Sequence, residues 1–133
     1  MTERPVVRRS HIVLACVLAI AVLAPGWAGA DTTAARVSRR GACSGPSVWK
    51  LSVARDAGRL TIRFLVRGGK ADQRWNVFIS DNGERVFTGS RISGAGGYFA
   101  VRADTRDRAG RDRIKASAVN TVSGESCRGR AAI

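Results

Sequence analysis

A two-residue alternation of apolar and polar side chains most constrains the fold of this chain. In its clearest stretch, residues 60–66, every second position is a large apolar residue, and Thr61, Arg63 and Leu65 stand between them. Successive side chains of a β-strand point to opposite faces, so this spacing predicts strands with one buried face. No stretch of residues 31–133 has a convincing 3.6-residue period. The positions predicted to face inward are Trp49, Leu51, Val53, Leu60, Ile62, Phe64, Val66, Trp75, Val77, Ile79, Ile114, Ala116, Ala118, Cys127, Gly129, Ala131 and Ile133.

Turn signals separate these apolar stretches. The sequence Asp81-Asn82-Gly83-Glu84 is the strongest of them, because Asn-Gly readily adopts the positive φ angles of a tight hairpin. Residues 90–97 are rich in glycine, and residues 104–112 are rich in charge, so both are expected to be irregular connections. Each interval between turns suits one short strand.

This spacing indicates seven short strands in about ninety residues. The predicted fold is all-β: an antiparallel, seven-stranded, immunoglobulin-like sandwich over residues 43–133, with a small barrel as the alternative. Residues 31–42 are polar and basic without periodicity, and they are expected to form a flexible leader.

The first thirty residues have the three parts of a secretory signal peptide. Met1–His11 is basic, Ile12–Ala24 is an unbroken apolar run, and Ala28-Gly29-Ala30 supplies the small residues of a cleavage site. We therefore expect cleavage after Ala30 and a secreted, extracellular product.

Three other interpretations of this segment stay open. An uncleaved membrane anchor needs about 20 apolar residues, and the run ends sooner, at Pro25. A lipid attached to Cys16 would follow a hydrophobic stretch that is too short for such a signal. The pair Arg8-Arg9 fits a twin-arginine signal, but such pairs are frequent in basic amino-terminal segments.

Cysteine usage agrees with export. Cys16 and the only histidine, His11, lie in the segment expected to be removed, so Cys43 and Cys127 are the thiols that remain. In an oxidising compartment a single disulfide between them is the natural expectation. A redox-active pair would favour a C-x-x-C spacing, and a zinc site needs four ligands.

Three segments carry a resemblance to a known group: Cys43–Leu51, Trp75–Gly89 and Asp112–Cys127. Together they resemble small exported, functionally uncharacterised proteins of high-GC Gram-positive bacteria with an immunoglobulin- or fibronectin III-like domain. The last two predicted strands are also similar to the end of a fibronectin type III domain. The resemblance implies export and fold, and it implies no activity.

Few residues suited to catalysis remain after cleavage. Without histidine, no serine has the usual base. The glycines of residues 94–97 do not open a helix after a strand, so no phosphate-binding loop is expected. Turn chemistry and solvated ion pairs account for the acids. We therefore expect no enzyme activity, no cofactor and no metal. The acids considered for catalysis or calcium binding are Asp81, Glu84, Asp104, Asp107 and Asp112.

Charge is the remaining signal. The full chain has a formal net charge of +13; removing residues 1–30 takes away three arginines and one glutamate, which leaves 20 basic and nine acidic residues, about +11. Such a charge attracts anionic polymers or membranes. Strand alternation also places polar residues outward on any soluble protein. The candidate contacts to a polyanion are Lys50, Arg63 and Arg67 on one sheet and Lys115, Arg128 and Arg130 on the other.

Two functions follow from these observations. The first is a secreted, non-catalytic interaction module at the cell envelope, whose partner is a protein or a cell-wall component. The alternative is a cationic binder of anionic polymers: wall polymers, acidic glycans or nucleic acid. Nucleic acid ranks below the others because most aromatic residues are expected to face inward rather than to stack on bases.

Overall fold

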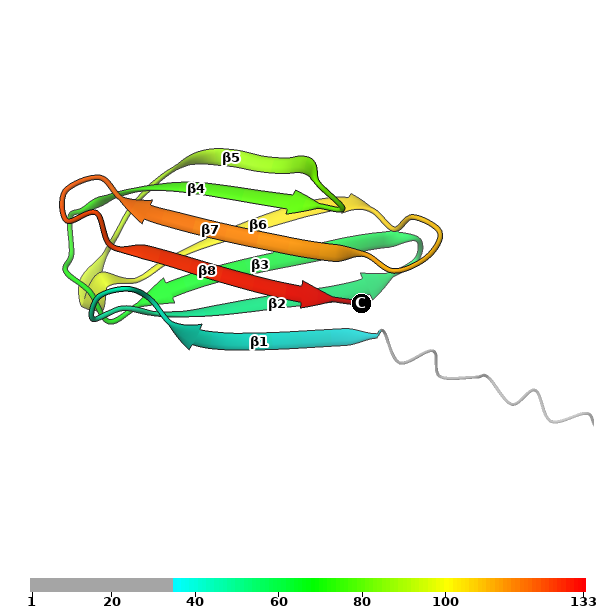
Figure 1. The fold of residues 1–133 in the computed structure, drawn as a ribbon, viewed down its shortest axis with the longest axis horizontal. Coiled ribbons are helices and arrows are strands. Elements are labelled where there is room, and N and C mark those ends of the chain that lie inside the picture. Colours follow the sequence, from blue (N-terminus) through cyan, green and yellow to red (C-terminus); the bar gives the residue numbers. More distant parts are fainter. Residues whose placement is uncertain (1–34) are drawn as a thin grey trace, which may run out of the picture. The chain divides into compact units, whose positions relative to one another are not determined.

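A computed structural model describes residues 35–133, which form eight strands and one short 3-10 helix (Figure 1). The proposed signal segment and the first residues of the proposed leader lie outside the described residues. The elements are β1 (Arg36–Ala42), β2 (Val48–Asp56), β3 (Arg59–Arg67), β4 (Arg74–Asp81), β5 (Glu84–Ile92), η1 (Ala95–Gly97), β6 (Phe99–Arg106), β7 (Arg113–Asn120) and β8 (Ser126–Ala132).

The strands form two four-stranded antiparallel sheets, ordered β1-β2-β3-β6 and β5-β4-β7-β8. We call these the first and the second sheet. They stack on a shared apolar core, so the all-β sandwich expectation is confirmed, and the sheets stay separate rather than closing into one barrel. The hairpin at Asn82-Gly83 is also confirmed, with φ angles of 48° and 86° at these two residues.

The predicted number of strands was too low by one. The additional strand is β1, which occupies residues assigned to the flexible leader and pairs with the edge of β2 from Arg36↔Ala54 to Ala42↔Val48. Its only large apolar side chain, Val37, packs on the core. Backbone pairing with a free strand edge requires no apolar alternation, and this explains why the sequence pattern did not reveal β1.

Two connections are shorter than expected. Strand β5 extends into the glycine-rich segment as far as Ile92, because its pairing with β4 continues to Arg74. Strand β6 continues into the charged segment to Arg106, opposite Arg59. In both places the backbone ladder of a neighbouring strand outweighs local composition.

The core follows the predicted alternation. The four inward-facing apolar residues of β3 are fully buried, and Trp75 of β4 packs against Phe99 of β6 with ring centroids 5.4 Å apart. The buried apolar residues are Leu51, Val53, Leu60, Ile62, Phe64, Val66, Trp75, Val77, Ile79, Phe99, Val101, Ala103, Ile114, Ala116, Ala118, Cys127 and Ala131.

One edge of the sandwich is closed by a tryptophan and a disulfide. A Cβ atom added to Gly41 of β1 or Gly129 of β8 would lie 2.8 Å from the indole of Trp49, so this ring fits between two glycines on opposite sheets. Next to it, Cys43 and Cys127 form the predicted disulfide. The Ser44 N–H donates to the Ser126 carbonyl at 2.8 Å and extends the link. The β1–β2 connection is thereby joined to β8.

Candidate functional site

The outer face of the first sheet gathers basic side chains from all four strands. Five of them lie on the half of the face nearest the disulfide, and we call these five the cationic band: Arg40 on β1, Lys50 on β2, Arg63 and Arg67 on β3, and Arg102 on β6. Three of the five, Lys50, Arg63 and Arg67, are residues predicted as polyanion contacts.

Within the band, cations face cations across neighbouring strands. Arg40 lies directly opposite Lys50, and Arg63 lies directly opposite Arg102. Like charges in directly opposed positions destabilise a sheet. Among the described residues, only Arg102 of the band is close enough to a carboxylate for an ion pair, with its Nε 3.6 Å from Asp104 Oδ2. The repulsion in the band is therefore mostly uncompensated within residues 35–133.

The surface between these cations is apolar and hollowed. A groove of about 610 Å³ is lined by Arg40, Lys50 and Arg67 of the band. Its apolar surface comes from Val48, Trp49, Leu65 and Tyr98. The Tyr98 side chain is 42% exposed, and its hydroxyl accepts a hydrogen bond of 3.2 Å from Arg63 Nη2. A ligand in this groove would meet several cations at the edge of an apolar surface.

The far half of the same face is different. Arg59 and Arg106 are again directly opposed, but two acids accompany them on this half. Asp56 pairs with Arg59 across the strands, and Asp104 accepts a hydrogen bond of 2.6 Å from Thr61. The acids on this face therefore lie at one end, and the cationic band lies at the other.

A second basic cluster lies where β7 and β8 approach β1. Lys115 and Arg130, both predicted contacts, are directly opposite each other on the second sheet. The third predicted contact on this sheet, Arg128, is exposed opposite Ser117 and lies outside the cluster. We call the cluster the basic hollow: a depression of about 350 Å³ whose charged lining residues are Arg39, Arg111, Arg113, Lys115 and Arg130.

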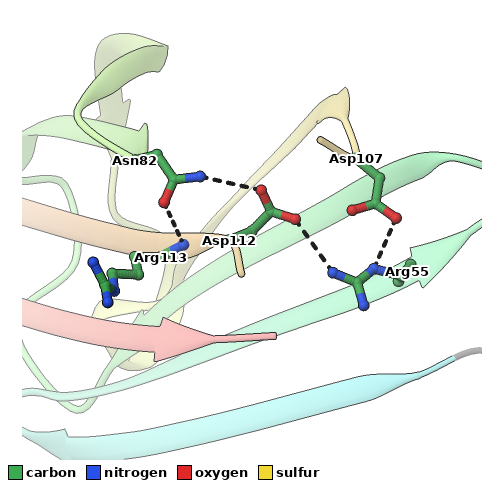
Figure 2. A network of polar contacts seen from close by, with 5 residues as sticks. All are labelled: Arg55, Asn82, Asp107, Asp112 and Arg113. Carbon is green, nitrogen blue, oxygen red and sulfur yellow. Dashed lines mark hydrogen bonds and ion pairs between the residues drawn. The ribbon is translucent and has the colours of Figure 1, made fainter. Parts of the chain in front are cut away.

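Two of the acids considered for catalysis or calcium binding, Asp107 and Asp112, lie together at the end of the sandwich away from the disulfide. Figure 2 shows them in a polar network with Arg55. Arg55 Nε lies 2.8 Å from Asp107 Oδ2, and its Nη2 lies 3.3 Å from Asp112 Oδ2. Asn82 donates to the other Asp112 oxygen at 3.2 Å and accepts from the Arg113 backbone N–H at 3.0 Å. These contacts join β2, the β4–β5 hairpin and the β6–β7 connection.

Burial sets the electrostatics of this network, which we call the Arg55 network. The Asp112 side chain is 1% exposed. Burial raises its pKa, the hydrogen bond with Asp107 raises it further, and Arg55 lowers it. Burial also raises the pKa of the neighbouring Asp81, with a further contribution from the Asp112 charge. The outermost acid, Glu84, pairs with Arg108, and this hydrogen bond lowers the Glu84 pKa. The arrangement suits a structural role, because its central carboxylate is enclosed by protein groups.

Several residues of the two basic clusters are not predicted by the sequence. Arg39 and Arg40 fall in the predicted leader, and only the pairing of β1 with β2 places them in these clusters. Arg102 lies on the outward positions of an alternating stretch, so the period-two rule would have found it. Arg111 lies in the β6–β7 connection, where no periodicity predicts direction, whereas Arg113 begins β7 and continues the outward alternation of Lys115.

Comparison with protein families, curated proteins and solved structures gives no match for this chain. Across residues 35–133, no three histidine, cysteine, aspartate or glutamate side chains are grouped as a metal ion would require. The described part of the chain contains no helix with the length and apolar character needed to cross a membrane.

Proposed function

We propose that this protein is an exported, non-catalytic β-sandwich module that binds anionic polymers of the cell envelope through its cationic band. The observation that carries the proposal is the pair of directly opposed cations, Arg40 with Lys50 and Arg63 with Arg102, on a part of the sheet where acids are scarce. Such an arrangement lowers the stability of the free protein. Features that oppose stability are expected at functional sites, and a bound polyanion would relieve this repulsion.

The dimensions of the band suit a polymer rather than a small ion. Strands lie about 4.8 Å apart, so the four strands from β1 to β6 place basic side chains across about 14 Å. The apolar surface of Val48, Leu65 and Tyr98 lies within that width and would contact the uncharged parts of the polymer. Acidic glycans and wall polymers combine charged and uncharged units in this way.

Export and the finer fold assignment belong to the same proposal. The Cys43–Cys127 disulfide supports an oxidising compartment, and the signal-like segment before Ala30 supports secretion. With β1 set aside, the orders β2-β3-β6 and β5-β4-β7-β8 correspond to strands A-B-E and C′-C-F-G of an immunoglobulin-like sandwich. This order supports an immunoglobulin-like domain of the small exported group that the sequence resembles.

A salt titration with matched variants tests the function. The probe is fluorescently labelled inorganic polyphosphate, and the variant pair is Arg63→Gln/Arg102→Gln against Arg59→Gln/Arg106→Gln. Both pairs remove two opposed cations from β3 and β6. Only the first pair lies in the band.

We expect the band variant to lose roughly tenfold in affinity at low salt and to reduce the slope of log K against log salt by between one and two. The control variant should change both much less. Binding without salt dependence would indicate a partner recognised by shape, and equal losses in the two variants would mean that overall charge, not the band, binds the polymer. Preference for nucleic acid over polyphosphate at equal charge would contradict a generic polyanion site.

Export has its own test. The intact mass of the protein recovered from the culture medium should correspond to residues 31–133 less two hydrogens for the disulfide. A lipid mass on Cys16 or retention of the first thirty residues would contradict this part of the proposal.

A further inference from the structure

Strand β1 lies between the two basic clusters. Its neighbouring residues Arg39 and Arg40 point to opposite sides of the first sheet, because successive side chains of a strand alternate. Arg40 belongs to the cationic band, and Arg39 lines the basic hollow. Figure 1 shows β1 at the edge of the first sheet, and β1 also contacts β8, the edge strand of the second sheet.

The two clusters are continuous around this edge. A further depression is lined by Ser38, Arg39, Arg40 and Lys50, so it shares Arg40 and Lys50 with the groove of the band and Arg39 with the basic hollow. A path of basic side chains therefore leads from the outer face of the first sheet, over β1, to the second sheet.

The hollow has no acid to neutralise it among its lining residues. The nearest acid in sequence is Asp112, between Arg111 and Arg113. Its carboxylate is 1% exposed and is bonded to Asn82 and Arg55, so it faces away from the ligand side of the hollow. Lys115 and Arg130 are also directly opposed like charges, as in the band. Like the band, the hollow therefore holds directly opposed cations with no acid among its lining residues.

We propose that one flexible, linear polyanion occupies both clusters at once by wrapping around the β1 edge. The inference rests on the proposed function and adds the shape of the ligand. The path crosses about 14 Å of the first sheet, about 10 Å between the sheets and one further strand spacing, or about 30 Å in all. It turns from one sheet to the other, so a flat bilayer or a stiff nucleic-acid duplex cannot follow it. A single flexible chain can.

The experiment compares polyphosphate chains too short to span about 15 Å with chains longer than about 30 Å. If the path is continuous, each protein should bind two short chains, one in each cluster. It should bind only one long chain, and with a much higher affinity than either short chain. Calorimetry at low salt measures both stoichiometry and affinity. Two long chains bound per protein would overturn the wrapping model.

Variants distinguish wrapping from binding at the band alone. Lys115→Gln/Arg130→Gln removes two cations from the hollow, and Arg128→Gln with Arg74→Gln is the control on the same sheet outside the hollow. The hollow variant should weaken the long chain by roughly tenfold and eliminate one short-chain site, whereas the control should change both less. Circular dichroism and melting confirm that each variant is folded.

A duplex DNA of matched charge completes the test. A rigid duplex can contact only one cluster at a time, so the hollow variant should lower its affinity far less than it lowers that of the long polyphosphate. An equal loss for duplex and polyphosphate would show that a rigid ligand reaches both clusters and would contradict wrapping. If the hollow variant leaves long-chain affinity unchanged while the band variant lowers it, wrapping fails and the proposed function stands. If no polyanion binds the unaltered protein at low salt, the proposed function itself fails.

Discussion

The Arg55 network and the cationic band use the same residue type in opposite ways. Arg55 lies between two carboxylates, at 2.8 and 3.3 Å, and joins β2 to the β6–β7 connection at one end of the sandwich. Arg63, in the middle of β3, lies opposite another arginine and donates a hydrogen bond to the Tyr98 hydroxyl. The first arrangement places one cation between two anions, and the second places two cations side by side. Counting arginines therefore predicts neither role, because their cross-strand neighbours decide it.

The largest expected effect comes from removing the disulfide. This bond anchors the end of the molecule nearest the band, so its removal should leave the Arg55 network intact. Cys43→Ala/Cys127→Ala opens a loop with a sequence separation of 84, so the free energy of unfolding should fall by roughly 4–5 kcal/mol. Denaturant unfolding measures the change, and chemical reduction of the unaltered protein serves as a control. Unchanged stability would mean that the bond does not constrain the chain in solution.

The next effect should appear in the Arg55 network. Arg55→Met keeps the apolar stem but leaves Asp107 and Asp112 without their cation. We expect a loss of about 3 kcal/mol, because removing one partner leaves buried carboxylates uncompensated. Polyphosphate affinity should stay the same, since Arg55 belongs to neither basic cluster. A loss of affinity in a folded variant would remove the contrast between the two regions.

A smaller effect of opposite sign is expected in the band. Lys50→Thr removes the repulsion with Arg40 and keeps a residue suited to strands, so stability should rise by about 0.5 kcal/mol while polyanion affinity falls. Ser52→Thr on the same strand and face is the matched control for strand propensity. If the control gains as much stability as Lys50→Thr, repulsion across the band is negligible.

The smallest effect is a pH dependence in the hairpin next to the Arg55 network. Burial raises the Asp81 pKa above its ordinary value of 3.8, so the folded state holds this proton more tightly than the unfolded state. The contribution of Asp81 to stability is therefore greatest below pH 3.8 and is lost as pH rises through the folded-state pKa. Asp81→Asn should gain stability relative to the unaltered protein over that interval.

Glu84→Gln, across the same turn, should behave in the opposite way. The hydrogen bond from Arg108 lowers the Glu84 pKa, so its contribution is present above the ordinary value of 4.5 and is lost as pH falls. Thermal melting of both variants between pH 3 and 7 measures the two trends. If the stability difference from the unaltered protein changed with pH in the same direction for both variants, burial would not dominate the Asp81 pKa while pairing with Arg108 dominates the Glu84 pKa.

Much of the fold was predictable, because burying one face of a strand produces a two-residue alternation of apolar and polar residues in the sequence. The alternation of β3 and the Asn82-Gly83 turn each pointed to one local structure, and both are present. Strand β1 was not predictable, because an edge strand held by backbone pairing leaves little apolar signal around Val37. The charged clusters were half predictable: alternation gives the outward direction of Arg63, whereas only the sheet register reveals that Arg102 faces it.

Because Trp49 lies between Gly41 and Gly129, its fluorescence should report on the edge where β1 meets β8. Indole emission depends on the surroundings of the ring, and detachment of β1 would expose this ring to water on one side. The other tryptophan of the described domain, Trp75, is 1% exposed in the core, so its emission should change only when the whole sandwich opens. Fraying of one strand and global melting should therefore be distinguishable spectroscopically in the same sample.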